Sequence, residues 1–302
     1  MNKRVTLNII SHFGRSEIRE NRKRFHQQQL IWASNNFKKE DIYIASQAYN
    51  VDEYNHDIVG NYVDCLFTHC SNPTGPARNV LLKRFYESDE DYAIFVDNDS
   101  ILDERNMGSL QELLRLDISS FGLITPVYPA QLGTGAFTKS FETGIYKGFN
   151  LKNNFVFERC LARGNFMIIK NFKKHHNTEI WFDDGTKTPG SGGEDNIFGV
   201  DIVTKLNLKV MLCRNLVIKE LATGKNSASW LFSNSSNPHR DMESKYKENM
   251  QTLFSEYGIY VKTVNGKKQL SKKDFFKKYD FTGKMFALPK ENYKENKIDN
   301  YF

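Results

Sequence analysis

The chain has 302 residues, of which 39% are hydrophobic and 13% aromatic, and its formal net charge is +6. Such a composition can bury a substantial core, which excludes a globally disordered chain. No apolar run approaches the roughly 20 residues that a membrane-spanning helix needs, and the apolar stretch near the start is too short for a signal peptide. We therefore expect a cytoplasmic protein built as one large domain, or as one domain with an added subdomain.

The positive charge is concentrated at the two ends of the sequence. Residues 1–35 carry seven cations against two acids, and residues 240–302 carry fourteen cations against nine acids, so each end has a balance of +5 and the middle of the chain −4. Basic ends of this kind indicate an anionic partner outside the chemical site. A lysine- and asparagine-rich surface that is merely solvated explains the same charges, and both interpretations stay open.

Short β-branched runs alternate with helical stretches in the first 130 residues. The expected strands lie at residues 5–10, 41–45, 62–68, 91–97 and 121–128, and the expected helices at 17–35, 75–88 and 104–116. Strands that alternate with helices of about ten residues or more predict an α/β fold with a mostly parallel, doubly wound central sheet. Ligands of such sheets bind at the carboxyl ends of the strands.

The pattern becomes irregular after residue 130, because several glycines interrupt it. We expect a strand at 160–170, a polar loop at 177–195, a helix at 196–206 and a strand at 208–218. The chain then divides into residues 1–130 and 131–239, which form one domain, and residues 240–302. The last part is basic and inclined to form helices, so we expect a separate helical appendage there.

The most informative segment is the acidic end of the fourth expected strand. Asp97 and Asp99 follow the apolar run Tyr92–Val96, and side chains at i and i+2 can reach the same side of a turn. Carboxylate oxygens suit Mg²⁺ or Mn²⁺, ions that leave coordination positions open for phosphate oxygens. A turn in which either aspartate only caps the next helix is the alternative. The clustering of acids where this fold binds ligands favours the metal site.

The residues around this segment resemble a known family. The run 75–102, GPARNVLLKRFYESDEDYAIFVDNDSIL, is similar to the donor-binding half of nucleotide-sugar glycosyltransferases with the GT-A fold, in which a helix with Ala-Arg-Asn precedes a strand that ends in a metal-binding Asp-x-Asp motif. The resemblance implies a GT-A, Rossmann-like fold, with residues 1–130 as the donor-binding half and residues 131–239 as the acceptor-binding half. It further implies that Asp97 and Asp99 hold Mn²⁺ or Mg²⁺ and a nucleotide-sugar donor.

The same resemblance implies further donor contacts. An arginine near a diphosphate is chemically sensible, because its charge-assisted hydrogen bonds can be bidentate. For Arg78 a surface position paired with a glutamate is the alternative, and for His12 a core or capping position. The donor pocket that the family implies consists of Ser11, His12, Phe13, Arg78, Asn79 and Asn98, beside the two aspartates.

A second carboxylate pair lies in the segment Gly192-Gly193-Glu194-Asp195. It is similar to the GGED segment of inverting GT-A galactosyltransferases, which implies that Asp195 is the base on the acceptor hydroxyl and that Glu194 orients the acceptor or the loop. The alternative is an ordinary helix start, where acids are favoured by the helix dipole. A related retaining branch also carries Gly-Gly-Glu, so the stereochemistry stays open, with inversion favoured.

The loop before this pair is a candidate lid. Its glycines and threonines would let it close over the donor and exclude water. Trp181 could stack on a sugar or a base, or could be a core residue. Gly192 and Gly193 permit a close approach of the backbone to the acceptor.

One family feature is missing. The family often supplies a histidine as third metal ligand just after the strand that follows the base helix, but residues 217–221 read VIKEL here. His239, about 20 residues later, is the candidate substitute. A solvent-exposed histidine without a metal is the alternative.

The acceptor is predicted from composition alone. A chain rich in Lys, Asn and Phe and poor in cysteine resembles the DNA-modifying glycosyltransferases of tailed phages, which act on hydroxymethylcytosine and would work in the host cytoplasm. The basic N- and C-terminal regions could flank double-stranded DNA, since phosphate backbones are bound chiefly by Lys and Arg. A cell-surface or capsular saccharide is the alternative acceptor.

Two other classes of protein remain as alternatives. A non-catalytic nucleic-acid-binding module on the same fold would need neither carboxylate pair, and both pairs are present. A nucleotidyltransferase would also use paired acids and Mg²⁺. It would usually carry a Gly-rich basic segment after the first strand, and Phe13-Gly14-Arg15 is a poor match to that pattern.

Overall fold

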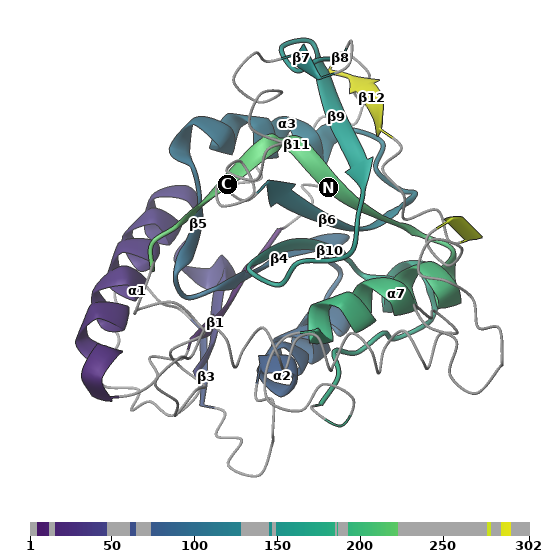
Figure 1. Cartoon of the computed structure of the whole chain (residues 1–302). Coiled ribbons are helices and arrows are strands. Elements are labelled where there is room, and N and C mark those ends of the chain that lie inside the picture. Colours follow the sequence, from purple (N-terminus) through teal and green to yellow (C-terminus); the bar gives the residue numbers. More distant parts are fainter. Residues whose placement is uncertain are drawn as a thin grey trace, which may run out of the picture.

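The computed structural model describes a mixed central sheet with helices on both faces (Figure 1). Along the sheet the strand order is β12-β9-β11-β6-β10-β4-β1-β2-β3, and β5 pairs with β11 off this path. The strands β3, β2, β1 and β4 are mutually parallel, and β6 is parallel to β11. The described residues are 5–11, 16–46, 61–64, 74–127, 145–146, 149–184, 186, 193–222, 277–278 and 285–290.

The strands of the described chain are short, except for the twelve-residue β11. A further pair, β7 and β8, forms a separate two-stranded sheet. The bounds of the strands are β1 Leu7–Ser11, β2 Ile42–Ser46, β3 Asn61–Asp64, β4 Tyr92–Asp97, β5 Ser100–Leu102, β6 Phe121–Val127, β7 Ile145–Tyr146, β8 Phe149–Asn150, β9 Asn154–Arg159, β10 Phe166–Lys170, β11 Lys209–Glu220 and β12 Met285–Pro289.

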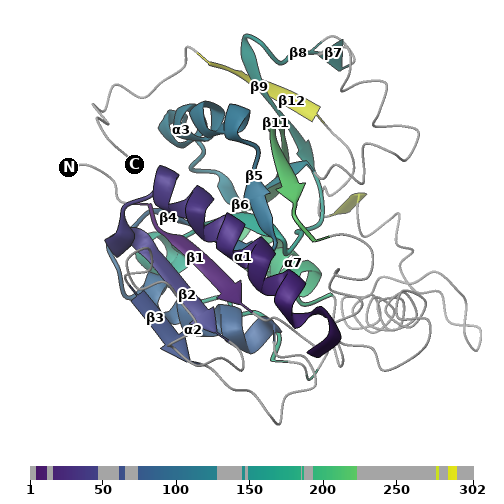
Figure 2. The same cartoon turned by 90° about the vertical axis from the view of Figure 1, so that its left-hand side faces the viewer.

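Helix α1 covers one face of the sheet, and α2 and α7 cover the other (Figure 2). Alternate side chains of β4 point to opposite faces: Ile94 and Val96 pack with α1 and α3, whereas Ala93 and Phe95 pack with α2 and α7. A strand buried on both faces reads as a continuous apolar run. The helices are α1 Ser16–Asn36, α2 Thr74–Tyr86, α3 Met107–Arg115, α6 Phe172–His176 and α7 Glu194–Leu206, with short 3₁₀ turns at Lys39–Asp41 and Glu104–Asn106.

The predicted α/β class with a mostly parallel sheet and flanking helices is confirmed. Strands β10 and β9 interrupt the parallel order. β10 runs antiparallel to both of its neighbours, β4 and β6, and β9 runs antiparallel to β11. The expected strand at 160–170 begins only at Phe166. Residues 160–165 instead form the connection from β9 to β10, and Arg163, Gly164 and Asn165 interrupt the apolar pattern there. β9 itself was not expected.

The expected separate C-terminal appendage differs from the structure at one described segment. β12, Met285–Pro289, pairs antiparallel with β9 and so belongs to the central sheet. Its apolar residues explain this, because Phe286 and Leu288 pack against the core on the side of α3. Residues 277–278 are helical, and the rest of the predicted appendage lies outside the described residues.

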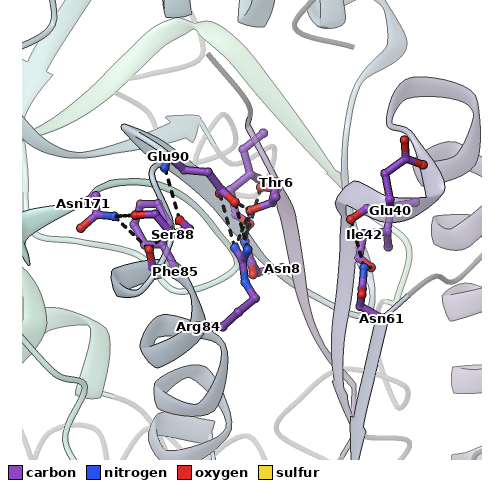
Figure 3. Close-up of polar contacts among 11 residues, drawn as sticks. Thr6, Asn8, Glu40, Ile42, Asn61, Arg84, Phe85, Ser88, Glu90 and Asn171 are labelled. Carbon is purple, nitrogen blue, oxygen red and sulfur yellow. Dashed lines mark hydrogen bonds and ion pairs between the residues drawn. The ribbon is translucent and has the colours of Figure 1, made fainter. Parts of the chain in front are cut away.

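A buried polar network ties the first strand to α2 at the end of the sheet where β1 and β4 begin (Figure 3). Thr6 Oγ1 donates to Glu90 Oε2 at 2.6 Å, and Arg84 donates to both Glu90 Oε1 at 2.9 Å and Thr6 Oγ1 at 2.8 Å. The guanidinium of Arg84 also lies 3.9 Å from the centre of the Tyr43 ring in β2.

None of the described helices is long and apolar enough to cross a membrane.

Candidate active site

The Asp-x-Asp segment forms a tight turn between β4 and β5. The backbone N–H of Asp97 donates to the carbonyl of Asn165 at 3.1 Å, and the backbone N–H of Leu221 donates to the carbonyl of Asp99 at 2.6 Å. The antiparallel register of β10 explains the first contact. Phe166 lies opposite Val96, so the preceding residue Asn165 lies beside the next residue of β4, Asp97. The turn is thus held between the start of β10 and the end of β11.

Arg78 of α2 joins this turn to the second carboxylate pair. Its Nη2 donates to Asp97 Oδ1 at 2.9 Å and to the carbonyl of Gly164 at 3.0 Å, and its Nη1 donates to Glu194 Oε1 at 2.7 Å. The side chain is only 2% exposed. Burial of an arginine is costly unless carboxylates compensate its charge, and here two of them do. The structure therefore brings Asp97 and Glu194, almost 100 residues apart in sequence, to one guanidinium.

Asp195 lies in the first turn of α7 beside the same connection. Its Oδ2 accepts the backbone N–H of Gly164 at 2.7 Å, and its Oδ1 accepts the backbone N–H of Asn196 at 2.8 Å. The helix is preceded by Gly193, whose φ of 103° lies in the left-handed region that favours glycine. Asp195 is therefore oriented by backbone donors, beside the connection that also contacts Arg78.

Three carboxyl groups of the site have raised pKa values. Burial raises the pKa of Asp97 to about 6. The positive charge of Arg78 lowers this pKa, and the negative charge of Asp99 raises it. Burial, followed by the charge of Glu194, raises the pKa of Asp195, and Arg78 opposes the shift. Burial, followed by the charge of Asp99, also raises the pKa of Glu220 at the end of β11. Their negative charge is thus incompletely compensated, which is the electrostatic condition that a bound cation would relieve.

The donor set of the turn fits a hard divalent cation. Asp97 Oδ1 accepts from Arg78, and Asp99 Oδ2 accepts from Arg22 of α1 at 2.5 Å. Asp99 Oδ1 accepts a long hydrogen bond of 3.4 Å from Ser100 Oγ, so the second oxygen of each aspartate still has a lone pair for a cation. Within the described ranges no group of three or more His, Cys, Asp or Glu side chains could hold a metal ion. With Asp97 and Asp99 as its ligands, a cation at this turn would leave positions for phosphate and water, as Mg²⁺ usually does.

The structure describes three of the other predicted residues, Ser11, Asn79 and Trp181. Ser11, at the carboxyl end of β1, is fully buried and lies opposite Ser46 of β2. Asn79 exchanges two hydrogen bonds of 2.9 Å with the backbone of Phe182, so it anchors the segment after α6 to α2. Trp181 is 37% exposed and packs edge-to-face against Tyr86. The remaining predicted residues, His12, Phe13, Gly192 and His239, lie outside the described residues.

The structure places several residues at the site that sequence reasoning missed. Gly164 and Asn165 connect the two carboxylate pairs, and Asn165 Nδ2 also donates to Glu220 Oε1 at 2.9 Å. A Cβ on Gly164 would lie 2.5 Å from Nη2 of Arg78, so only glycine permits this approach. The sequence signal for these two residues was a glycine and an asparagine inside a strand-like run, a combination that indicates a bend or a close backbone contact.

No family model matches the chain, and no curated protein matches its sequence. Among solved structures, it is similar to glucosyl-3-phosphoglycerate synthase from Mycobacterium tuberculosis, solved with Mn²⁺, uridine diphosphate and glucosyl-3-phosphoglycerate: 12% identity, TM-score 0.46, covering 89% of this chain and 87% of that one. It is also similar to residues 1–349 of TarS from S. aureus, with 14% identity, TM-score 0.42, and 86% and 75% coverage.

A third similar structure is a putative nucleotide-diphospho-sugar transferase from Desulfovibrio desulfuricans G20, with 8% identity and a TM-score of 0.41. The match covers 82% of this chain and 98% of that one. At such identities the similarities concern the fold alone, and the functional assignment depends on the geometry of the site.

Proposed function

We propose that this protein is a metal-dependent glycosyltransferase with a GT-A type of site. It moves a sugar from a nucleotide-sugar donor to a hydroxyl acceptor, and the proposed donor is a UDP-sugar. The observation that carries the proposal is the junction at Arg78. One buried guanidinium contacts Asp97 of the Asp-x-Asp turn and Glu194 of the second pair. Donor and acceptor chemistry need adjacent acidic groups of this kind, one to hold a cation and one to accept a proton.

On the donor side, Asp97 and Asp99 would hold Mn²⁺ or Mg²⁺ through their second oxygens. When bound, the cation neutralises the charge that develops on the leaving diphosphate. Asn98 lies between the two aspartates, and its side-chain oxygen accepts from Arg22, so it fixes the shape of the turn. We assign Ser11, His12, Phe13 and Asn79 to the surroundings of the donor, with Asn79 acting through the segment that contains Trp181.

On the acceptor side, Asp195 is the proposed base. As the acceptor oxygen forms a bond to the anomeric carbon, its proton passes to the Asp195 carboxylate. The bond from the anomeric carbon to the diphosphate oxygen breaks, and its electron pair leaves with the nucleoside diphosphate. Attack opposite the leaving group inverts the anomeric centre. The raised pKa of Asp195 makes it a stronger base than an ordinary aspartate.

Three further roles follow for the acceptor side. Glu194 would orient the base region through its ion pair with Arg78. Gly192 and Gly193 would allow the backbone to approach the acceptor. Trp181, partly exposed, would stack on a sugar or a base.

The test is release of nucleotide from a panel of nucleotide sugars with Mn²⁺. Asp97→Asn and Asp99→Asn keep the side-chain volume and remove the charge, so we expect release to fall by at least about a hundredfold. Asp195→Asn should lower kcat by about 10²-fold to 10⁴-fold while the affinity for uridine diphosphate stays unchanged. Release that is unaffected by all three substitutions contradicts the proposal.

For the acceptor we propose hydroxymethylcytosine in DNA, because an anionic polymer suits the two basic ends of the sequence. In the described part of the N-terminal end, Arg24 of α1 is exposed. Hydroxymethylated DNA should stimulate nucleotide release, and DNA affinity should fall steeply as salt rises. Stimulation by a cell-surface saccharide instead of DNA would reassign the acceptor. DNA binding without any sugar transfer would favour the non-catalytic nucleic-acid-binding module.

A further inference from the structure

One face of α1 is polar and buried, which is unusual for a helix that packs on a sheet. Arg22, His26 and Gln29 are spaced by four and three residues, so they lie on the same side of the helix. Their exposed fractions are 3%, 2% and 0%. An apolar side chain would be expected at positions this deep, and polar groups are buried only where specific partners compensate them.

The partners of this face are the four residues of the Asp-x-Asp turn. Arg22 donates through Nη1 to Asp99 Oδ2 and through Nη2 to Asn98 Oδ1, each at 2.5 Å. Gln29 Nε2 donates to two backbone carbonyls, those of Asp97 and Ser100, each at 2.6 Å.

His26 completes the set. Its Nδ1 lies 3.0 Å from Gln29 Oε1, so the ring holds the amide in the orientation that directs its N–H groups at the turn. Every residue from Asp97 to Ser100 therefore receives a hydrogen bond from Arg22 or Gln29.

These contacts determine the direction of the ligand oxygens. The guanidinium holds one oxygen of Asp99 and thereby fixes the orientation of the other. The Gln29 amide bridges the carbonyls on both sides of the motif, which prevents the turn from opening. A site whose ligands are oriented before binding loses less conformational freedom when the ligand arrives.

We infer that Arg22, His26 and Gln29 are positioning residues that preorganise the Asp-x-Asp turn for its cation and the attached diphosphate. The inference extends the proposed function, since it concerns the same turn. It assigns a role in ligand affinity to a helix that touches neither reacting group. A purely structural role predicts a different result, in which substitutions change the stability of the protein and leave the affinity of the turn for Mn²⁺ unaltered.

The experiment measures Mn²⁺ binding to the full-length protein, alone and with uridine diphosphate, from the loss of the free Mn²⁺ electron paramagnetic resonance signal. Arg22→Lys keeps the charge and loses the fork that reaches two acceptors. Gln29→Met keeps the volume and loses both donors. We expect each variant to bind Mn²⁺ with uridine diphosphate at least about tenfold more weakly, the effect of losing one or two hydrogen bonds to charged or buried acceptors.

Two controls separate positioning from folding. Arg24→Lys is the same substitution two residues further along α1, at an exposed position. This variant should bind Mn²⁺ with uridine diphosphate as tightly as the wild type does. Phe37→Leu removes buried apolar volume just beyond the end of α1 and should lower the melting temperature without changing Mn²⁺ affinity. Melting curves without metal show whether each variant is folded.

The outcomes distinguish this inference from the proposed function. The inference is overturned if folded Arg22→Lys and Gln29→Met bind Mn²⁺ with uridine diphosphate as the wild type does while Asp97→Asn abolishes binding. That result leaves the proposed function intact. Equal weakening by Phe37→Leu also overturns the inference. Wild-type protein that binds no Mn²⁺ overturns both. Weakened binding in the two α1 variants supports the inference even where no sugar in the panel is transferred.

Discussion

At the scale of single residues, Arg78 has the contacts that join the two carboxylate pairs. The resemblance places it near the donor, and the alternative pairs it with a glutamate on the surface. In the structure it is almost fully buried and contacts Asp97, Glu194 and Gly164. It therefore orients Asp97 and Glu194, and a role in donor binding stays a prediction. Its positive charge also keeps the pKa of Asp195 lower than burial alone would set it.

The pKa of Asp195 leads to a prediction for Glu194→Gln. Burial and then the charge of Glu194 raise the pKa of Asp195. Removing that charge lowers the pKa, while glutamine can still accept the hydrogen bond from Arg78. The base acts as a carboxylate, so activity is lost as the pH falls through its pKa. In Glu194→Gln the acidic limb of kcat/KM should therefore move to lower pH.

This prediction is measured as kcat/KM against pH from about 4.5 to 8. The control is the same Glu194→Gln substitution combined with Asp195→Asn, whose residual activity should lack the limb of Asp195 and keep any limb of Asp97, whose pKa is about 6. An acidic limb that stays in place or moves to higher pH in Glu194→Gln would contradict the assignment of Asp195 as the base.

At the scale of the elements, α1 links stability to pH through His26. Burial lowers the pKa of His26 to about 4 from its usual 6.5, which is the sign of a histidine kept neutral in the fold. Between these values the unfolded chain binds the proton and the folded chain does not. The stability that His26 contributes is therefore complete above pH 6.5 and is lost as the pH falls towards 4, by about 3 kcal/mol in all.

The corresponding variant is His26→Gln, which does not titrate. Between pH 7.5 and pH 4, we expect the unfolding free energy of the wild type to fall by about 3 kcal/mol more than that of the variant. Urea unfolding at a series of pH values measures it. Asp97, whose pKa is raised to about 6, acts in the opposite direction, but it is present in both proteins and cancels in the difference. A constant difference across this range would refute the assignment.

The start of α2 gives a prediction about close packing. A Cβ on Gly75 would lie 1.8 Å from the backbone oxygen of Asp183, so Gly75→Ala must displace backbone and should destabilise the protein by about 2 kcal/mol or more. Gly108 of α3 has nothing within 4 Å of the same position. Gly108→Ala should therefore stabilise by about 1 kcal/mol, because alanine restricts the unfolded chain and favours the helix. Thermal unfolding of the two variants checks the opposite signs.

At the scale of the whole molecule, the network of Thr6, Asn8, Arg84 and Glu90 in Figure 3 connects β1, α2 and the segment before β4. It lies at the opposite end of the β1 and β4 strands from the candidate active site. Glu90 is the acceptor that both Thr6 and Arg84 share. Glu90→Ala leaves a partly buried guanidinium without its carboxylate, and we expect a loss of about 2 kcal/mol of stability. Glu87→Ala, at an exposed position nearby, is the matched control and should change little. Equal unfolding free energies of the two variants would show that the network contributes nothing.

The sequence by itself determined the α/β class and the location of the two carboxylate pairs. Both depend on local patterns: an apolar run such as Tyr92–Val96 predicts a strand buried on both faces, and acids directly after it must lie at the carboxyl end. The apolar spacing of residues 196–206 likewise predicted a helix, although α7 begins two residues earlier, at Glu194. The roles assigned to these residues stay predictions until activity is measured.

Only the tertiary structure decided which residues surround those carboxylates. Asn165 meets Asp97 because β10 runs antiparallel to β4, and no local pattern encodes that pairing. Arg22 and Gln29 reach the turn because α1 lies across the sheet next to β5, although about 70 residues separate them from it in sequence. Periodicity reports which face of an element is buried, whereas the partners of a buried polar group depend on how distant elements pack.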